Sequence, residues 1–200
     1  MMPRNVSSRS KTITLFGSFR PKPGTPDYLT AYQAGALLAR AGFTLANGGF
    51  GGTMEASAKG AREAGGTTVG VVFSKHGLHA NPYIGRLEKK KTLLGRLERL
   101  VTIADGYIVF KGGTGTLLEI SLVLEYTHKQ FSSPKPMVFL GEFWKETVAT
   151  AQQEAGYDPR FHFTAQANQM MRLIRFVSSP QEAVQAFQEM FSHDVSQKKG

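Results

Sequence analysis

Three short glycine-rich segments carry the first chemical signal in this sequence. They are Gly17-Ser18, Gly48-Gly-Phe-Gly-Gly52 and Gly112-Gly-Thr-Gly-Thr116. Glycine lets backbone N–H groups come close to an oxyanion, and a helix that begins at such a turn adds partial positive charge. The hydroxyls of Thr114 and Thr116 would complete a cradle for a phosphate group. The alternative is that the three segments are only tight turns between strands and helices.

Other familiar kinds of site are not found in the sequence. No Gly-x-Gly-x-x-Gly is followed by an acid about 20 residues later, and no Gly-Lys-Ser or Gly-Lys-Thr occurs, so NAD and P-loop ATP binding are not favoured. The chain has no cysteine, which excludes disulfides, thiolate zinc sites, iron–sulfur clusters and a cysteine nucleophile. His76 and His79 have no supporting acid, so we expect no metal site, and we expect no bound cofactor.

The glycine segments follow apolar stretches that alternate with helical patterns along the chain. We expect strands at residues 11–16, 43–46, 67–73, 106–110, 136–140 and 171–177. We expect helices at residues 27–42, 53–64, 86–102, 116–129, 143–155 and 180–191. Strands that alternate with helices predict right-handed crossovers and a parallel sheet with helices on both faces. In such a fold ligands bind beyond the carboxyl ends of the strands, where the three glycine segments would lie.

We therefore predict a single α/β domain with a Rossmann-like parallel sheet. It would cover residues 12–192, between a basic N-terminal tail of residues 1–11 and a C-terminal tail of residues 193–200. The helix expected at residues 116–129 is too apolar to lie on the surface, so it would be buried or at a subunit interface. We interpret Trp144 and the phenylalanines as core residues rather than as platforms for a nucleotide base.

The chain is strongly basic. Its 200 residues include 24 Lys and Arg against 15 Asp and Glu, a formal net charge of +9. This charge favours anionic partners, although the two tails account for part of the excess. Nucleic acid is not the expected partner, because aromatic residues are not interleaved with the basic runs as a stacking groove requires. No apolar run is long enough to cross a membrane and the N-terminus has no apolar signal region, so we expect a cytoplasmic protein without a membrane segment.

Residues 111–119 resemble the signature of a known family. Their sequence, Lys-Gly-Gly-Thr-Gly-Thr-Leu-Leu-Glu, is similar to the Pro-Gly-Gly-x-Gly-Thr-x-x-Glu motif of the Lonely Guy family, whose members are often mislabelled as lysine decarboxylases. Arg96 lies 23 residues before Glu119, which matches the spacing of the family's catalytic Arg–Glu pair. The segment from Gly48 to Glu55 is more like the bacterial, molybdenum-cofactor-carrier-like branch of the family than the cytokinin-activating one. The resemblance covers residues 12–178.

The resemblance implies hydrolysis of the N-glycosidic bond of a nucleoside 5′-monophosphate to free base and ribose 5-phosphate. Glu119 would stabilise the oxocarbenium-like ribosyl centre or orient the attacking water. Arg96 would hold that carboxylate ionised through a bidentate pair, and the 5′-phosphate would lie on residues 113–116. A homodimer across the helix at 116–129 is also implied. The residues implied for binding phosphate and nucleotide are Gly17, Ser18, Gly48, Gly49, Gly51, Gly52, Met54, Glu55, Gly112, Gly113, Thr114, Gly115 and Thr116.

Two alternatives remain open at this point. The same glycine loops would serve a carrier that binds a phosphate-bearing pterin (the molybdenum cofactor) or a nucleotide without turnover. Glu119 would also suit a capping box, in which it bonds back to the Thr116 N–H. Two positions depart from the family, since Lys111 replaces the leading Pro and Leu97 replaces a basic residue, which removes a cation from the expected site. Decarboxylation of lysine is rejected, because nothing in the sequence marks a pyridoxal phosphate site.

Overall fold

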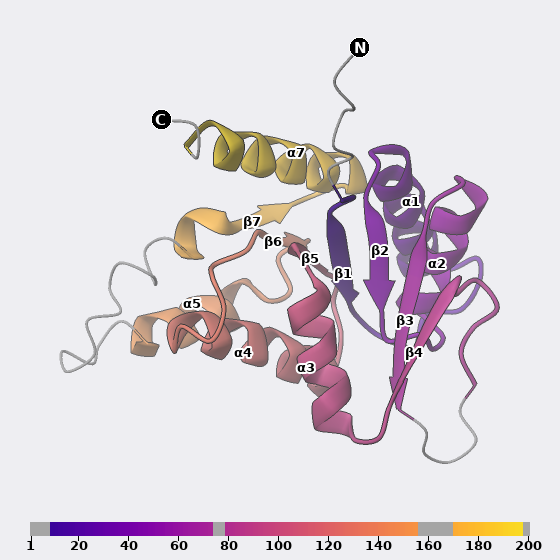
Figure 1. Cartoon of the computed structure of the whole chain (residues 1–200), viewed down its shortest axis with the longest axis horizontal. Coiled ribbons are helices and arrows are strands. Elements are labelled where there is room, and N and C mark those ends of the chain that lie inside the picture. Colours follow the sequence, from indigo (N-terminus) through magenta and orange to yellow (C-terminus); the bar gives the residue numbers. More distant parts are fainter. Residues whose placement is uncertain (1–8, 74–78, 156–169, 198–200) are drawn as a thin grey trace, which may run out of the picture.

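The computed structural model describes residues 9–73, 79–155 and 170–197. Within these residues, seven strands form one parallel sheet in the order β4-β3-β2-β1-β5-β6-β7 (Figure 1). The strands are β1 (Thr12–Phe16), β2 (Thr44–Asn47), β3 (Thr68–Phe73), β4 (Arg86–Lys90), β5 (Gly106–Val109), β6 (Met137–Leu140) and β7 (Ile174–Val177). The helices are α1 (Pro26–Arg40), α2 (Thr53–Glu63), α3 (Leu93–Ile103), α4 (Thr114–His128), α5 (Lys145–Ala155) and α7 (Pro180–Gln197).

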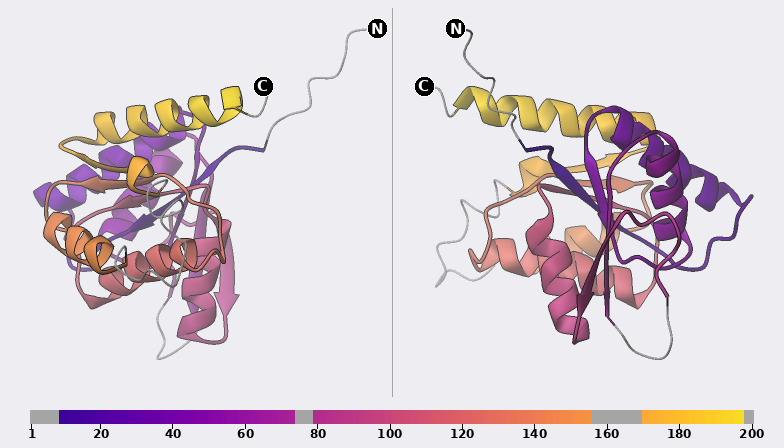
Figure 2. Two further views of the ribbon diagram at one scale, coloured as in Figure 1. Left: turned by 90° about the vertical axis from the view of Figure 1, so that its left-hand side faces the viewer. Right: turned by 45° about the vertical axis from the view of Figure 1, so that its right-hand side comes forward.

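Helices cover both faces of the sheet (Figures 1 and 2). On one face α1, α2 and α7 enclose an apolar cluster to which the sheet contributes Leu15 and Ile108. On the other face α3, α4 and α5 enclose a second cluster, which contains Phe16 and Val109. Every residue of β1 and β5 is buried, as is typical of parallel strands with helices on both sides. The predicted single α/β domain with a parallel sheet is confirmed.

The main departure from the predicted elements lies at residues 86–102, where we expected one charged helix. The structure has instead the edge strand β4, followed by the shorter helix α3. Edge strands carry charged side chains that discourage pairing with another chain, so their composition resembles that of an exposed helix. The two elements are separated at Thr92, whose hydroxyl accepts a hydrogen bond from the Gly95 N–H at 3.0 Å and caps α3.

Two boundaries near the C-terminal end also differ from the prediction. Strand β7 begins at Ile174 rather than at residue 171, and residues 170–173 form a helical turn. Helix α7 continues to Gln197, beyond the end that we expected at residue 191. Neither difference alters the order of the strands.

The order of strands reverses direction at β1. The chain runs outward from β1 through β2 and β3 to β4, and then returns so that β5 pairs with the other side of β1. Open α/β sheets bind ligands beyond the carboxyl ends of their strands at such a reversal. The three glycine segments follow β2, β1 and β5, which are neighbours in the sheet, so the fold brings all three segments to one edge.

Two glycines bring α1 and α2 into close contact. A methyl group added at Gly35 of α1 would overlap the backbone carbonyl of Ser57, and one added at Gly60 of α2 would overlap the carbonyl of Tyr32. Rotation of a side chain cannot relieve either overlap, because both involve backbone atoms. The contact therefore fixes the position of α2, whose first turn follows the second glycine segment.

The close contact predicts that Gly35→Ala lowers the free energy of unfolding by about 1–3 kcal/mol, because the helices must separate to admit the methyl group. Urea unfolding followed by circular dichroism measures the change. Gly95→Ala is the matched control, since its methyl group would meet only the Thr92 hydroxyl, at 3.2 Å. It should preserve or raise stability, by up to about 1 kcal/mol. Equal stabilities of the two variants would contradict the constraint at Gly35.

Candidate functional site

The three loops surround one cavity of about 1100 Å³ at the carboxyl edge of the sheet. Pockets for small molecules measure roughly 300–1,000 Å³, so this cavity has room for a nucleotide. Its lining comes from the loop after β1, the start of α1, the loop after β2, the first turn of α2, helix α3, the segment that joins β5 to α4, the first two turns of α4, and the segment between β6 and α5. The lining residues are Gly17, Ser18, Phe19, Arg20, Pro21, Lys22, Thr25, Asp27, Phe50, Gly51, Met54, Arg96, Lys111, Gly112, Gly113, Thr114, Gly115, Thr116, Glu119 and Phe143.

Most of the predicted site residues line this cavity, and four do not. The four are Gly48, Gly49, Gly52 and Glu55. Glu55 instead accepts a hydrogen bond from the Tyr28 hydroxyl at 3.3 Å. Burial and the neighbouring Glu55 carboxylate raise the pKa of Tyr28 to about 12, so that hydroxyl remains a donor at neutral pH.

The glycines outside the lining shape the loop after β2. A methyl group at Gly48 would overlap the guanidinium of Arg96, so glycine is needed for that side chain to lie over the loop. Gly52 has a φ of +68°, and a methyl group there would also overlap the backbone of Ser18 and Phe19. These two positions therefore keep the first two loops and the buried arginine close together.

Arg96 and Glu119 meet at the cavity from different helices. The Arg96 Nη1 of α3 lies 3.7 Å from the Glu119 Oε1 of α4, and both side chains are about nine-tenths buried. The Arg96 Nε donates a hydrogen bond to the Val71 carbonyl at 2.9 Å, and the guanidinium lies 5.6 Å from the centre of the Phe50 ring. The predicted bidentate pair is wrong, because Nε is engaged with the backbone of β3 and the charged groups meet at one longer contact.

Burial has the largest effect on the pKa values of both side chains. Loss of hydration raises the pKa of Glu119 to about 7, and the attraction of Arg96 offsets only part of that increase. Loss of hydration also lowers the pKa of Arg96, which the charge of Glu119 partly restores. Arg96 therefore favours the ionised carboxylate, as expected, but does not offset the whole effect of burial. A carboxyl group with a pKa near neutrality is suited to both donating and accepting a proton.

Glu119 is not a helix cap. Helix α4 begins at Thr114 with Gly113 as its N-cap residue, so Glu119 lies in the second turn and cannot form a capping box with Thr116. The first turn of α4 carries the end of the third glycine segment, and Thr114, Gly115 and Thr116 all line the cavity. Unpaired N–H groups of a helix N-terminus lie here, where an anion is favoured.

Several lining residues were not predicted. Phe19 and Phe143 are 70% and 60% exposed, so the interpretation of the phenylalanines as core residues is wrong at these positions, although it holds for the buried Trp144. Lys111 lies at the cavity and forms an ion pair with Asp27 at 2.9 Å. The position of Phe19 directly after Gly17-Ser18, at the end of an apolar strand, is the feature of the sequence that could have indicated its place at the cavity.

The second departure from the family motif has a different outcome. Leu97 is 2% exposed and does not line the cavity, so this position does not take a cation from the cavity wall.

Among the residues that the structure describes, no three His, Asp or Glu side chains gather as a metal site would require. His76 lies outside the described residues. No helix in the described ranges is long and apolar enough to span a membrane.

Comparison with known proteins assigns the family. Residues 10–171 match the family model described as the SLOG cluster4 family. The chain belongs to the SLOG cluster4 family. This SLOG cluster4 protein is also 30% identical to the cytokinin riboside 5′-monophosphate phosphoribohydrolase of Rhodococcoides fascians over 142 residues, which are 66% of this chain and 68% of that protein. The resemblance to the Lonely Guy family is thereby confirmed.

Solved structures share the fold of this SLOG cluster4 protein. The molybdenum cofactor binding protein of Rippkaea orientalis has a TM-score of 0.67 and 26% identity, and the match covers 92% of this chain and 99% of that one. The molybdenum cofactor carrier protein of Chlamydomonas reinhardtii has a TM-score of 0.69 and 22% identity, with the same coverage of 92% and 99%. The SLOG cluster4 protein is thus similar to a hydrolase and to molybdenum cofactor binding proteins.

The raised pKa of Glu119 makes a prediction about the stability of this SLOG cluster4 protein. A glutamate titrates near 4.5 in the unfolded chain, whereas the pKa of folded Glu119 is about 7. The folded state therefore binds its proton more tightly, and the resulting stabilisation is complete below about pH 4.5 and is lost as the pH rises through about 7. Glu119→Gln removes this dependence. Its free energy of unfolding should rise relative to wild type between about pH 5 and 8, by about 1.4 kcal/mol for each unit by which the pKa is raised.

Urea unfolding of both proteins across this pH range measures the difference. Glu98→Gln removes an exposed carboxylate from α3 and controls for the loss of one negative charge. A difference between wild type and Glu119→Gln that stays constant from about pH 5 to 8 would contradict the raised pKa.

Proposed function

We propose that this protein hydrolyses the N-glycosidic bond of a nucleoside 5′-monophosphate and releases the free base and ribose 5-phosphate. The observation that carries the proposal is the buried pair of Arg96 and Glu119, which lines the same cavity as the segment Gly112–Thr116. A carboxyl group with a pKa of about 7 thus shares a cavity with a helix N-terminus suited to phosphate. The phosphoribohydrolase of Rhodococcoides fascians supports the same class of reaction.

In this proposal the 5′-phosphate binds at the N-terminus of α4. Free backbone N–H groups of the first turn and the hydroxyls of Thr114 and Thr116 would hold its oxygens. The phosphate takes no part in bond cleavage, but the free energy of binding it positions the ribosyl carbon. The rings of Phe19 and Phe143 at the cavity wall would contact the base.

The chemistry then requires Glu119 in its ionised form. As the C1′–N bond breaks, its electron pair leaves with the base, which takes up a proton from solvent, and positive charge develops on the ribosyl carbon. The carboxylate stabilises that charge and accepts a proton from the attacking water, whose oxygen becomes the new hydroxyl of ribose 5-phosphate, and then releases that proton to solvent. Arg96, at 3.7 Å, favours the ionised form against the effect of burial.

A second candidate function is a carrier of a phosphate-bearing pterin such as the molybdenum cofactor. The similarity to the Rippkaea orientalis molybdenum cofactor binding protein favours it, because that match covers 92% of this chain whereas the match to the hydrolase covers 66%. The glycine loops would bind the phosphate of the cargo in the same way. A carrier catalyses no reaction, however, so a carboxyl group with a pKa near neutrality would have no role in proton transfer.

The enzyme proposal predicts that Glu119→Gln reduces hydrolysis of a nucleoside monophosphate about 100-fold or more, because the variant keeps the shape of the side chain and loses its charge. Arg96→Ala should have a similar effect, and the double variant should be little slower than either single one if the two residues act as a unit. Release of adenine from AMP, measured by chromatography, gives the rates. Circular dichroism establishes that each variant is folded.

A wild-type protein that binds AMP and releases no adenine would favour the carrier function. Unchanged rates in Glu119→Gln would remove Glu119 from the reaction. Glu98→Gln provides the reference rate for loss of an exposed carboxylate.

The proposed enzyme is a homodimer that associates through α4. This helix exposes Leu117 and Leu118, at 37% and 43%, next to residues that line the cavity. Apolar side chains at such positions are buried favourably by a second copy of the same surface.

Sedimentation velocity should therefore show a dimer of the wild-type protein at micromolar concentration and a monomer of Leu118→Glu, because the variant would bury a charge in the interface. Leu29→Glu on α1, where the leucine is 49% exposed, is the matched control and should leave the dimer intact. A wild-type protein that sediments as a monomer would exclude this association.

A further inference from the structure

The cavity lining carries positive charge in addition to the helix N-terminus that would hold the 5′-phosphate. Arg20 and Lys22 line the cavity, and both are exposed. In the described part of the chain, neither side chain forms an ion pair or a hydrogen bond. From this charge we infer that the preferred ligand carries a second phosphate group, which Arg20 and Lys22 bind. The inference rests on the proposed binding of a nucleotide in this cavity.

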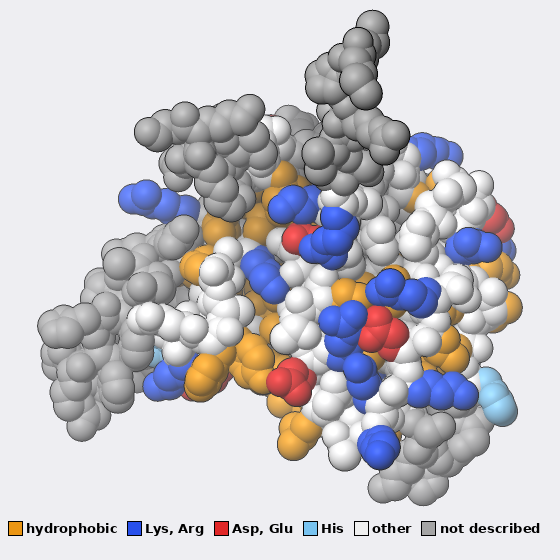
Figure 3. Space-filling model, viewed as in Figure 1, with side chains coloured by type: hydrophobic (Ala, Val, Ile, Leu, Met, Phe, Trp, Pro, Cys, Tyr) orange, Lys and Arg blue, Asp and Glu red, His pale blue; other side chains and the backbone are white. Residues whose placement is uncertain are grey.

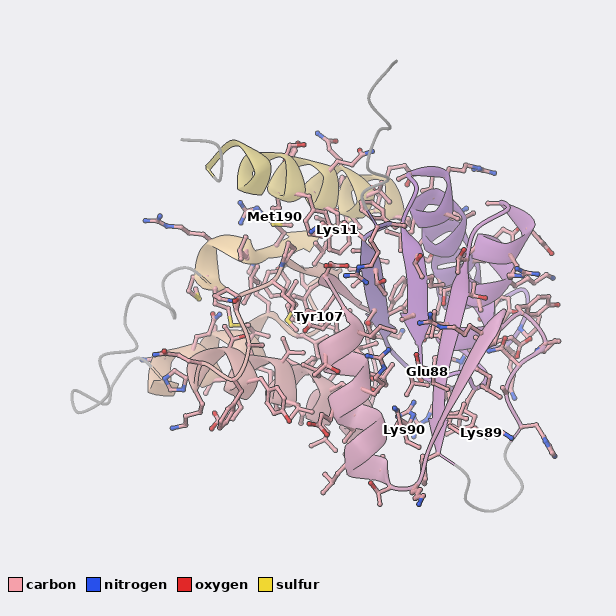
Figure 4. The ribbon with its side chains drawn as sticks, in the orientation of Figure 1. Lys11, Glu88, Lys89, Lys90, Tyr107 and Met190 are labelled. Atoms are coloured by element: carbon pink, nitrogen blue, oxygen red, sulfur yellow. The ribbon has the colours of Figure 1, made fainter. Side chains whose placement is uncertain are left out.

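One cluster of surface cations at the edge of the sheet is compensated by an acid. On β4 and α3, Glu88 accepts hydrogen bonds from Arg99 at 2.7 and 3.0 Å and pairs with Arg86 at 3.2 Å and Lys90 at 3.8 Å. Figure 3 shows cationic side chains around a single acid on this face, and Figure 4 labels Glu88 and Lys90. Such a cluster is a surface ion-pair network and not a site for an anion. Arg20 and Lys22 differ from this cluster because they line the cavity and, among the described residues, form no ion pair with an acid.

The other charged residues that line the cavity do not neutralise the positive charges of Arg20 and Lys22. Lys111 lines the cavity, but its Nζ lies 2.9 Å from the Asp27 carboxylate, so this pair is neutral overall. The remaining ionisable pair at the cavity, Arg96 and Glu119, is about nine-tenths buried, so it contributes little to the exposed charge of the lining. The net positive charge of the lining therefore comes from the two cations of the loop after β1.

The loop that carries the two cations is held in place. The Ser18 carbonyl accepts hydrogen bonds from the N–H of Thr53 at 2.9 Å and from its hydroxyl at 3.0 Å, and the Ser18 hydroxyl accepts one from the Arg20 N–H at 3.1 Å. Thr25 donates to the Lys22 carbonyl from its N–H at 3.0 Å and from its hydroxyl at 2.8 Å. Prolines on both sides of Lys22 restrict the backbone further. The backbone that carries the two cations therefore needs little ordering when an anion binds.

The cavity has room for a ligand larger than a nucleoside monophosphate. Its volume of about 1100 Å³ lies just above the range of roughly 300–1,000 Å³ for small-molecule pockets. The N-terminus of α4 and the loop after β1 contribute to the same lining, so one ligand can contact both. The second phosphate belongs either to a nucleoside 5′-diphosphate or to a nucleoside 3′,5′-bisphosphate, and the probes below distinguish these sources.

The test compares the affinities of wild-type protein for three adenine nucleotides by titration calorimetry. The probes are 9-deaza analogues of AMP, ADP and adenosine 3′,5′-bisphosphate, whose carbon-linked base cannot be hydrolysed. At least one of the two doubly phosphorylated probes should bind about tenfold or more tightly than the AMP analogue, because charge-assisted hydrogen bonds are added. The advantage should shrink as salt is raised, since exposed charges are screened.

The double variant Arg20→Gln/Lys22→Gln should remove this advantage and leave the affinity for the AMP analogue within about twofold. Lys89→Gln/Lys91→Gln removes the same number of charges at the edge of the sheet and should keep the advantage, which controls for net charge. Equal affinities of wild type for all three probes would overturn the inference, as would an advantage that survives in Arg20→Gln/Lys22→Gln.

The result of this binding test can be separated from the result of the hydrolysis test. Hydrolysis of AMP together with equal affinities would leave the enzyme proposal intact and exclude the second phosphate. Preferential binding of a doubly phosphorylated probe without hydrolysis of AMP would support the second phosphate and reject the enzyme. Binding of none of the probes would reject both.

Discussion

The geometry of the site depends on the burial of Arg96. A guanidinium that leaves water is destabilising unless other groups replace its hydration. The Val71 carbonyl, the Phe50 ring and the Glu119 carboxylate supply that replacement from β3, the loop after β2 and α4. Gly48 leaves the space that the side chain occupies. Four segments that are distant in the sequence must therefore come together before this one side chain can be buried.

The same burial determines the chemistry of Glu119. An exposed glutamate beside an arginine would be fully ionised at neutral pH, whereas here the loss of hydration outweighs the attraction of Arg96 and raises the pKa to about 7. The fold thus holds a carboxyl group that exchanges its proton near neutrality. That property is unfavourable for stability at high pH and suits a group that must accept a proton from water.

The general fold could be predicted because parallel strands between two helical layers are buried on both faces. Stretches such as Thr12–Phe16 and Gly106–Val109 are therefore apolar or small throughout, and the glycine segments mark where each strand ends. Strand β4 could not be predicted in this way, since it lies at the edge of the sheet and its Arg86–Lys90 sequence is set by exposure to solvent. The predicted meeting of the three glycine segments followed from topology alone, because adjacent parallel strands end at the same edge.

The details of the site could be predicted only where local sequence determines them. The family motif indicated Arg96 and Glu119, but the direction of the pKa shift depends on burial by residues from several elements, which spacing does not encode. The pairing of Lys111 with Asp27 joins the loop after β5 to the first turn of α1, which is remote in sequence. The exposure of Phe19 depends on the path of the loop after β1, which is fixed by its hydrogen bonds to Thr53.

The separate anchoring of the three loops has a consequence for how this architecture can diversify. Each loop leaves its own strand, and the strands are joined by backbone hydrogen bonds that do not depend on loop side chains. Substitutions at the mouth, as at Lys111, can therefore alter which molecule is admitted while the N-terminal end of α4 stays as it is. One scaffold can in this way acquire new ligands through changes in a single loop, without passing through sequences that fail to fold.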